Sequence, residues 1–479
     1  MPLFSPSRFQ APFLPLGKVS AGERLSAWVE RLIKGWLFGC RMCGNCILQE
    51  TALICPMTCA KGLRNGPCGE TGEGCVVDAA RPCTWRLIYE RSERWGWLDR
   101  LLEVNAPIEG NRAGRETWLD LLRRWREGGG KPNPLDLIFQ RARFKEEYAR
   151  LLYRIRQPEW WQGDAHYHPA GYEQPVSALE QALRRGAFVI TADLEVPEEA
   201  APQRIQTLAQ RVGGHVVSAN FADNAYAMSR MSSLACCLQL QQAGVEAVLQ
   251  LQCRDRTRAA LVSDALGAAT LGIRNILCLG GDFHNKAPAP QALPHQFDID
   301  SVQLLWILRR LRDEGKYPDG RQIEQRPSYF LGASAAPLAA PPRFDAVRLE
   351  KKINAGAQFI QTQMIFDAAR FGEWLEALDG RGLLEKVFIL AGVLPLRSAE
   401  EARMFSAEPG ILLPAAVLRR MEAAEEKDRR TSAGDHQQQE GRAIALELAH
   451  ALKAMRGVRG IHWMIGGQEH SLSALLENL

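Results

Sequence analysis

Eight of the twelve cysteines of this 479-residue chain lie between residues 40 and 83. They are Cys40, Cys43, Cys46, Cys55, Cys59, Cys68, Cys75 and Cys83. The first three are each separated by two residues, so one tight loop can direct their thiolates to three corners of a cuboidal iron–sulfur cluster. A more distant cysteine can supply the fourth corner, and eight thiolates are sufficient for two such clusters. The segment therefore predicts one or two 4Fe-4S clusters, with all eight cysteines as candidate ligands.

Zinc is the alternative interpretation of these cysteines, and disulfides are the third. Zinc modules commonly present two separate Cys-x-x-Cys knuckles to one tetrahedron, whereas here the first knuckle runs directly into a third cysteine. Disulfides are disfavoured because residues 1–20 are interrupted by prolines and lack the basic start and continuous apolar core of a secretory signal. No run of eighteen apolar residues suggests a membrane span. We therefore expect a cytoplasmic protein, in which clustered thiols indicate metal or redox chemistry.

Length and residue patterns divide the chain into three expected parts. A chain of 479 residues is too long for one ordinary core. Nine of its twelve tryptophans precede residue 162, and apolar residues recur at helical spacing over 115–127. We expect an N-terminal extension at 1–38, a cysteine-rich domain with a helical wrap at 39–160, broken at 128–134, and a third domain at 175–479. A net charge of +4, without a concentrated basic run, does not indicate a nucleic-acid partner.

The third domain alternates between two kinds of segment. Short apolar, β-branched runs, typical of parallel strands buried on both faces, occur at 188–196, 215–221, 247–253, 275–281, 329–335, 359–365, 387–393 and 461–467. Helical periodicity separates them, at 201–212, 231–243, 258–271, 301–314 and 344–355. Eight such units predict an α/β fold, a closed (βα)8 TIM barrel. A doubly wound open sheet is the alternative, disfavoured because no G-x-G-x-x-G turn follows the first strand. The charged, glutamine-rich stretch 423–442 is interpreted as an exposed loop over the barrel rim.

Polar residues at the carboxyl ends of the strands are the candidate site residues, because a barrel gathers its active site there. On the first, third and sixth strands they are spaced two apart, so they share a face. Two glycines end the fourth strand, where the backbone can approach a flat ligand closely. The residues are Asp193 and Glu195, Gln250 and Gln252, Gly280, Gly281 and Asp282, and Gln361 and Gln363. Their convergence on one rim predicts a functional site.

Several of these segments resemble a known family. The strings GCRMCGNC (39–46), CPMTC (55–59) and LRNGPCG (63–69) are similar to the cysteine-rich module associated with methylenetetrahydrofolate reductase. That module occurs as a small subunit in acetogens and as a fused domain elsewhere. The barrel half resembles methylenetetrahydrofolate reductase itself, through RMSSLA (230–235), LQLQCRDR (249–256), LGIRNI (271–276), GD (281–282) and AGAQFIQTQ (355–363). The resemblance covers nearly the whole chain apart from its start and the tryptophan-rich middle.

The resemblance implies reduction of 5,10-methylenetetrahydrofolate to 5-methyltetrahydrofolate by a flavin in the barrel mouth, with FAD favoured over FMN. The family credits the proton that opens the substrate ring to a glutamate on the first strand, and aligning FVITA (188–192) places Asp193 there. Because aspartate is one methylene shorter, Glu195 is the other candidate acid. Asp282 and Gln363 match the residues that bind the folate.

Other positions match residues that hold the flavin in this family. The cofactor contacts it implies are Gln250, Gln252, Gly281, Asp282, Asp345, Arg348, Lys351 and Lys352. Asp345 matches a contact to the ribityl chain or ribose, and the two lysines match basic residues near the phosphates. Arg348 stands where the family has asparagine, and Gln250 replaces a histidine close to the isoalloxazine.

The fused cysteine module changes the expected electron source. Iron–sulfur clusters would admit electrons one at a time from ferredoxin or a partner oxidoreductase, for the flavin to convert into a hydride. Two alternatives stay open. One is a zinc-stabilised module beside a barrel served by NAD(P)H; the other is a catalytically impaired electron-transfer or scaffold subunit, motivated by Asp193, Gly280 and Gln250. The partner subunits and the oligomeric state, a homo-oligomer included, are left open.

Overall fold

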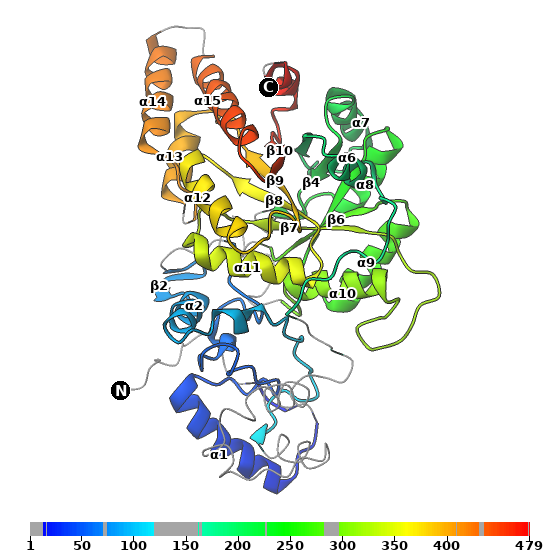
Figure 1. The fold of residues 1–479 in the computed structure, drawn as a ribbon, viewed down its shortest axis with the longest axis vertical. Helices are drawn as coiled ribbons and strands as arrows, with labels where there is room; N and C mark the ends of the chain where they lie inside the picture. The colour runs from blue at the N-terminus through cyan, green and yellow to red at the C-terminus, as the bar shows by residue number, and fades with distance from the viewer. Residues whose placement is uncertain are drawn as a thin grey trace.

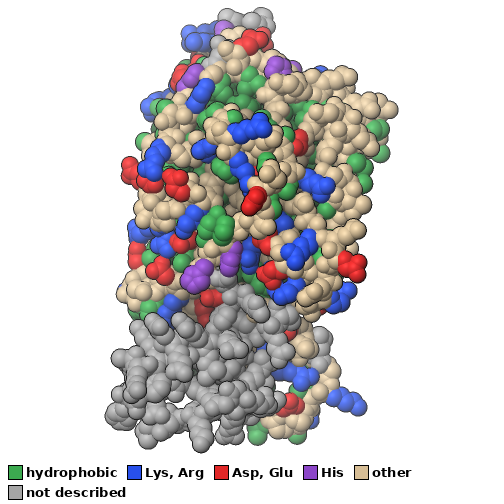
Figure 2. Space-filling model, turned by 45° about the vertical axis from the view of Figure 1, so that its right-hand side comes forward, with side chains coloured by type: hydrophobic (Ala, Val, Ile, Leu, Met, Phe, Trp, Pro, Cys, Tyr) green, Lys and Arg blue, Asp and Glu red, His purple; other side chains and the backbone are tan. Residues whose placement is uncertain are grey.

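The computed structural model describes residues 13–15, 17–69, 74–118, 161, 165–225, 228–281, 297–408, 410–430, 435–477 and 479. It shows a cysteine-rich module, blue in Figure 1, beside a barrel coloured from green through yellow to red. None of the described helices is both long enough and apolar enough to cross a membrane. On the face in Figure 2, basic and acidic side chains are interspersed over the barrel, in line with their nearly equal numbers.

Eight parallel strands close into the barrel, in the order β10-β3-β4-β5-β6-β7-β8-β9. They are β3 (Val189–Leu194), β4 (Ser218–Phe221), β5 (Ala247–Gln252), β6 (Asn275–Leu279), β7 (Phe330–Ala335), β8 (Phe359–Met364), β9 (Phe388–Val393) and β10 (Val458–Met464). All eight overlap the apolar runs in the sequence, so the predicted (βα)8 barrel is confirmed. Every residue of β5 is buried, because helices cover its outer face and side chains fill the barrel on its inner face.

Helices follow the strands along the chain and surround the barrel (Figure 1). They are α7 (Pro202–Val212), α8 (Ser233–Gln242), α9 (Arg258–Thr270), α10 (Ser301–Asp313), α11 (Pro342–Ala355), α12 (Ala368–Asp379), α13 (Ala399–Ala407), α14 (Ala415–Arg430), α15 (His436–Lys453) and α16 (Leu472–Leu476), with a short 3-10 turn η5 (Glu469–Ser471). Trp306 of α10 and Trp374 of α12 are buried between helices and strands. The five helices predicted from periodicity coincide with α7 to α11.

The stretch 423–442 differs from its prediction, and the expected exposed loop is wrong. Most of it forms the end of α14 and the start of α15, which pack against each other. Opposite charges four residues apart stabilise the end of α14, as in the ion pair of Arg430 with Glu426 at 2.9 Å. The only buried residues among the described ones of α14 are Met421 and Ala424. The residues of this stretch therefore have the polar composition of an exposed loop, although the spacing of their charges is that of a helix.

Short elements joined by loops form the cysteine-rich module. They are α1 (Ala21–Phe38), η1 (Pro56–Thr58), β1 (Gly74–Cys75), β2 (Asp78–Pro82), α2 (Thr84–Arg94) and η2 (Leu98–Leu102). α1 begins at a capping box of Ser20 and Glu23. It ends at Gly39, whose left-handed φ of 67° turns the chain sharply into Cys40. The helix predicted at 115–127 and its break at 128–134 lie outside the described residues from 119 onward.

The module lies over the carboxyl end of the barrel, next to α10 and α11 (Figure 1). Asp300, the N-cap of α10, accepts hydrogen bonds at Oδ2 from the backbone N–H groups of Arg64 (3.2 Å) and Asn65 (3.0 Å). Its other oxygen accepts the N–H of Gln303 at 2.9 Å. Phe344 of α11 adds an apolar contact by packing with residues of α2 and η2. One buried carboxylate thus joins the module to the first turn of a barrel helix.

The amino end of the barrel is closed by α6 (Ala178–Arg184), a helix that the sequence analysis did not predict. Leu179 and Leu183 are fully buried in one apolar cluster with Phe330 and Phe359. Those two phenylalanines begin β7 and β8, and their rings stack at 4.8 Å. α6 and these phenylalanines thus form an apolar plug at the amino end of the barrel.

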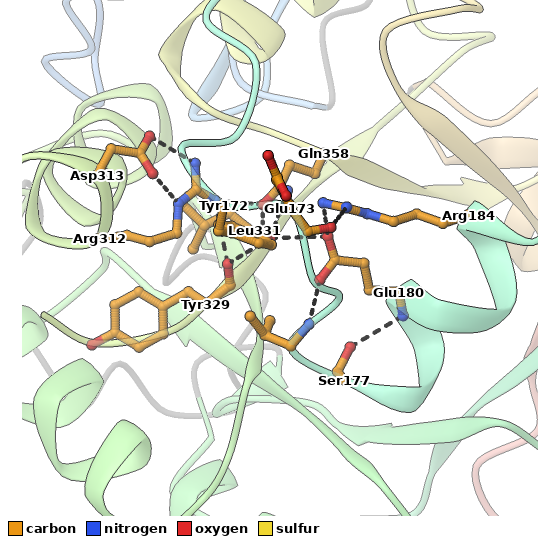
Figure 3. Close-up of polar contacts among 11 residues, drawn as sticks. Tyr172, Glu173, Ser177, Glu180, Arg184, Arg312, Asp313, Tyr329, Leu331 and Gln358 are labelled. Atoms are coloured by element: carbon orange, nitrogen blue, oxygen red, sulfur yellow. Dashed lines mark hydrogen bonds and ion pairs between the residues drawn. The ribbon is translucent and has the colours of Figure 1, made fainter.

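A polar network accompanies this plug and is drawn in Figure 3. The hydroxyl of Tyr172 donates to Glu180 Oε1 at 3.0 Å and accepts from Gln358 Nε2 at 2.8 Å. Arg312 donates to the backbone carbonyl of Tyr329 at 3.3 Å. The groups of this network partner one another, as expected for the end of a (βα)8 barrel that serves stability.

Candidate active site at the barrel mouth

A cavity of about 270 Å3 lies at the barrel mouth, between the carboxyl ends of the strands and residues 61–69 of the module. Its barrel wall includes Asp193, Gln250, Gln252, Gly280, Gly281, Ser334, Arg348, Lys352, Gln361, Thr362, Gln363 and His462. The module contributes Lys61, Asn65, Pro67, Cys68 and Gly69. Seven of the strand-end residues predicted to converge therefore meet at one cavity, and the cysteine module roofs it: Asp193, Gln250, Gln252, Gly280, Gly281, Gln361 and Gln363.

Asp193, near the end of β3, is held by two neighbours in this cavity. Gln250 Nε2 donates to Asp193 Oδ1 at 3.2 Å, and His462 Nε2 lies 3.3 Å from Asp193 Oδ2. The other ring nitrogen of His462 lies 2.9 Å from the Thr191 hydroxyl. The tautomer of His462 sets the direction of both contacts. With the proton on Nδ1 the ring donates to the hydroxyl, and Nε2 can accept the proton of the Asp193 carboxyl group; with the proton on Nε2 the ring donates to the carboxylate. Both oxygens of Asp193 thus have fixed partners.

His462 is a site residue that the sequence analysis missed. It lies within the last predicted strand, and the register of β10 against β3 places it opposite Thr191. A usable signal was its alternation with Met464, two residues further on, which also lines the cavity. Its contact with Thr191 joins residues 271 apart in the chain, so no local spacing indicates it.

Glu195, the other candidate acid, has a different environment. Its carboxylate pairs with Arg204 of α7, and its side chain is 39% exposed. Its backbone N–H donates to Glu469 at 2.8 Å. Glu195 is not among the residues that line the mouth cavity. The two carboxylates of the first strand therefore face different surroundings.

The remaining strand-end residues shape the cavity wall. Gln361 accepts a hydrogen bond at 2.9 Å from Asn220, which fixes its amide, and Gln363 lines the cavity beside it. Gly281 has a φ of 99°, and a Cβ there would lie 2.6 Å from Gln252 Cγ, so only glycine fits without rearrangement. Asp282, predicted to contact both folate and flavin, lies outside the described residues.

The flavin contacts predicted on α11 divide into two groups. Arg348 and Lys352 line the cavity, whereas Asp345 and Lys351 do not. Burial lowers the pKa of Lys352 to about 7, and its ammonium donates to the Ser334 carbonyl at 2.5 Å. Burial also lowers the pKa of Lys351 to about 8. Asp345 accepts from the indole N–H of Trp374 and from Arg348, so its carboxylate is occupied within the protein.

The eight clustered cysteines divide, in chain order, into two sets of four. Cys40, Cys43, Cys46 and Cys55 line one cavity, and Cys59, Cys68, Cys75 and Cys83 line another. The thiols whose pKa values affect one another most strongly belong to the same set. A hydrogen bond from Cys55 lowers the pKa of Cys40 to about 7. Burial, followed by the charge of Cys68, raises the pKa of Cys59 to about 12.

Two buried cations stand beside the first cysteine set. Lys34 lines the cavity of this set, pairs with Glu30, and donates to the Thr117 hydroxyl at 2.7 Å. The guanidinium of Arg64 lies 3.7 Å from Cys43 Sγ, and its other nitrogens donate to backbone carbonyls. Positive charge favours the thiolate, which is the metal-binding form of cysteine.

The two sets and the mouth cavity form a continuous series. Cys55 and Cys59 are separated by the single 3-10 turn η1, and the four steps between them span roughly 8 Å at about 2 Å per residue. Cys68 lines both the second cysteine cavity and the mouth cavity. A Cβ on the adjacent Gly69 would lie 3.7 Å from Gln363 Nε2. The second set thus lies directly against the wall of the candidate active site.

Each set offers four thiol donors, the number that a 4Fe-4S cluster or a tetrahedral zinc ion takes. Among the described residues, no three His, Cys, Asp or Glu side chains are arranged to hold one metal ion. A tetrahedral zinc site needs four ligands within about 2.3 Å of one point, whereas a 4Fe-4S cluster is ligated at separate corners. Each set lines a small cavity of about 20 Å3.

A parallel eight-stranded barrel with a carboxylate, an imidazole and amides at its carboxyl end has the construction of a barrel enzyme. The family model described as methylenetetrahydrofolate reductase matches residues 178–479, more than half of the chain. The chain therefore belongs to the methylenetetrahydrofolate reductase family, as the sequence resemblance indicated. A second model, described as methylene-tetrahydrofolate reductase C terminal, matches residues 19–111, which contain all eight clustered cysteines. A relation to the acetogen small subunit stays a prediction.

Individual relatives are distant. A probable methylenetetrahydrofolate reductase (NADPH) of Caenorhabditis elegans is 24% identical over 253 residues, covering 52% of this chain and 34% of the relative, so this chain spans only about a third of its length. The 5,10-methylenetetrahydrofolate reductase of Escherichia coli is 23% identical over 301 residues, covering 60% of this chain and 91% of the relative. The Salmonella typhimurium enzyme is 23% identical, covering 49% and 75%. A solved structure of an uncharacterized Clostridium thermocellum protein that binds two copies of 5-methyl-5,6,7,8-tetrahydrofolic acid is 14% identical with a TM-score of 0.43, covering 63% of this chain and 98% of that chain.

Proposed function

We propose that this protein reduces 5,10-methylenetetrahydrofolate to 5-methyltetrahydrofolate at the barrel mouth with a bound flavin. Family membership and the names of its bacterial relatives support the reaction. The observation that carries the proposal is the carboxyl group of Asp193, which faces the mouth cavity between Gln250 and His462.

Asp193 is the proposed general acid. The methylene carbon of the substrate bridges two nitrogens, so one C–N bond must break before a hydride can add, and the leaving nitrogen needs a proton. Gln250 and His462 hold the two oxygens of Asp193, which keeps this short side chain in one orientation at the cavity wall. Glu195, paired with Arg204 outside the cavity, is the weaker candidate.

The cavity lining fits a flavin next to a pterin. Gly281 lets a flat ring approach the backbone, and the amides of Gln250 and Gln252 offer donors and acceptors to a ring edge. Arg348 and Lys352 offer positive charge to a phosphate-bearing chain. A flavin bound there supplies the hydride. FAD remains the expected form, and the family resemblance assigns the folate to Gln363 and Asp282.

Replacement of Asp193 by Asn tests the acid. We expect kcat to fall about 10²- to 10⁴-fold, because the amide cannot donate a carboxyl proton, while flavin content and folate binding are retained. Glu195→Gln is the matched control and should keep nearly wild-type kcat. Full activity in Asp193→Asn, or the loss appearing in Glu195→Gln instead, would show that the role has been assigned to the wrong carboxylate.

We further propose that each cysteine set holds one 4Fe-4S cluster and that electrons reach the mouth from ferredoxin or a partner oxidoreductase. The support is the series of contacts from the first set through η1 to the second, and through Cys68 to the mouth cavity. Clusters of this kind transfer electrons singly. The buried cations Lys34 and Arg64 favour charged thiolates in the first set.

Metal analysis of anaerobically purified protein tests this relay. We expect about eight irons per chain and about four in Cys68→Ser, which should also lose ferredoxin-driven turnover. Cys236→Ser, at a fully buried thiol of α8, is the matched control and should keep the iron content. About one zinc without iron, together with NAD(P)H-driven turnover, would support the zinc-stabilised alternative. Protein without flavin and without turnover would support the impaired scaffold.

A further inference from the structure

The outer face of α1 carries an exposed apolar stripe. Leu25, Trp28, Val29, Leu32, Ile33 and Trp36 expose between 40% and 64% of their surfaces. They recur at helical spacings of three and four residues, which places them along one side of the helix. A contiguous apolar surface of this kind marks an interaction site on a folded protein.

The opposite face of α1 is fixed to the cysteine module by polar contacts. Glu30 is 1% exposed and accepts the backbone N–H of Thr117 at 2.6 Å. Lys34 pairs with Glu30, and both line the cavity of the first cysteine set. Turning the stripe inward would break this buried ion pair and expose a cavity wall, at a cost of several kcal/mol. The stripe therefore faces outward in the folded chain.

We propose that α1 pairs with α1 of a second copy of this chain, antiparallel, across a two-fold axis. The stripe is its own complement when the axis passes between residues 30 and 31. Leu25 then faces the partner's Trp36, and Trp28 faces the partner's Ile33. At the centre, Val29 faces the partner's Leu32. A two-fold axis generates each of these contacts twice, as an isologous interface requires.

The size and packing of the stripe fit this occupant. Together with Leu37, its exposed side chains present roughly 700 Å2, on a scale of about 200 Å2 for a large apolar side chain. Each partner in a standard protein interface contributes about 800 Å2. Leu25, Val29, Leu32 and Trp36 alternate spacings of four and three, the pattern of the seam of a helix pair.

The charges of α1 favour this partner over a lipid surface. Helices that lie in a membrane plane are rich in Lys and Arg on the polar face. On α1 the single lysine, Lys34, is buried against the module, and the exposed cations are limited to Arg24 and Arg31. An unrelated protein partner would not explain why the apolar residues of the stripe are placed symmetrically about its centre between residues 30 and 31.

Sedimentation equilibrium of the full, metal-loaded chain tests the interface. We expect a dimer for the wild type and monomers for Val29→Lys and for Leu32→Glu, with dissociation constants raised about 100-fold or more. An equimolar mixture of the two variants should dimerise again, because the lysine of one copy then faces the glutamate of the other. Met404→Lys, at a 53% exposed residue of α13, is the matched control and should stay dimeric.

Three outcomes would overturn the proposal. A monomeric wild type would do so, whether or not it floats with anionic phospholipid vesicles. Dimers that persist in both single variants would place the interface elsewhere. A mixture that stays monomeric, while each variant keeps the wild-type circular dichroism spectrum and iron content, would exclude the antiparallel register.

Discussion

Both ends of the barrel are closed, but by different kinds of contact. At the amino end α6 inserts leucines, and the polar groups around Tyr172 and Glu180 partner one another (Figure 3). At the carboxyl end the cysteine module roofs a cavity lined by polar groups, Asp193, Gln252 and Lys352 among them. Burial there lowers the pKa of Lys352 to about 7. Polar residues enclosed among one another stabilise a fold, whereas polar residues that line a cavity can also contact a ligand.

Glu180→Ala gives the strongest test of this comparison. The carboxylate of Glu180 is fully buried and accepts from the Tyr172 hydroxyl, from the Val176 N–H at 2.8 Å and from Arg184 at 2.7 Å. Removing it leaves the buried Val176 N–H without its acceptor and breaks the contacts to Tyr172 and Arg184, so we expect the free energy of unfolding to fall by about 3 kcal/mol. The kcat of the folded enzyme should not change. Urea unfolding and steady-state kinetics measure the two effects.

The surface change Glu199→Ala is the control for that variant, and it should shift the unfolding free energy by less than about 0.5 kcal/mol. If Glu180→Ala lowers kcat without lowering stability, the amino end has a functional role and the contrast between the two ends fails.

The barrel itself could be predicted from local pattern. All six residues of β5 are buried, as in other strands that are covered on both faces. Such strands appear in the sequence as continuous apolar runs between helical segments. The amino-end plug could not be predicted in this way. The contact of Tyr172 with Gln358 joins residues 186 apart, and nothing in the sequence near either residue indicates the other.

The candidate site was partly predictable for the same reason. Strand-end position was enough to bring Asp193, Gln250 and Gln363 to one cavity. It was not enough to separate Asp193 from Glu195, because their difference depends on Arg204 in the following helix. Spacing also identified the eight cysteines as candidate ligands, but their division into two sets becomes visible only when the chain is folded.

Lys352→Met tests the carboxyl end through pH. The pKa of this lysine falls from 10.5 to about 7 on folding, because burial disfavours its charge. Between these values the unfolded chain binds the extra proton, so the stability of the ligand-free protein rises with pH, by at most about 1.4 kcal/mol per unit. Below pH 7 both states are protonated and the penalty is constant. Lys352→Met should lower this slope by about 1 kcal/mol per pH unit between pH 7 and 8, as followed by urea unfolding at each pH. An unchanged slope would mean that folding does not lower the pKa of Lys352.

A matched pair of hydroxyl deletions gives the finest test of the comparison. Tyr172→Phe at the amino end and Thr191→Val at the mouth each remove one buried hydrogen-bonding group. Each should cost about 1 kcal/mol of unfolding free energy. Their effects on turnover should differ, because Thr191 fixes the ring of His462 that faces Asp193. We expect kcat to fall about tenfold in Thr191→Val, with an altered pH–rate profile, and to stay unchanged in Tyr172→Phe. Equal losses of kcat in the two variants would contradict the distinction between a stabilising end and a reacting end. Equal losses of unfolding free energy, with kcat lowered only in Thr191→Val, would show that turnover depends on the orientation of His462.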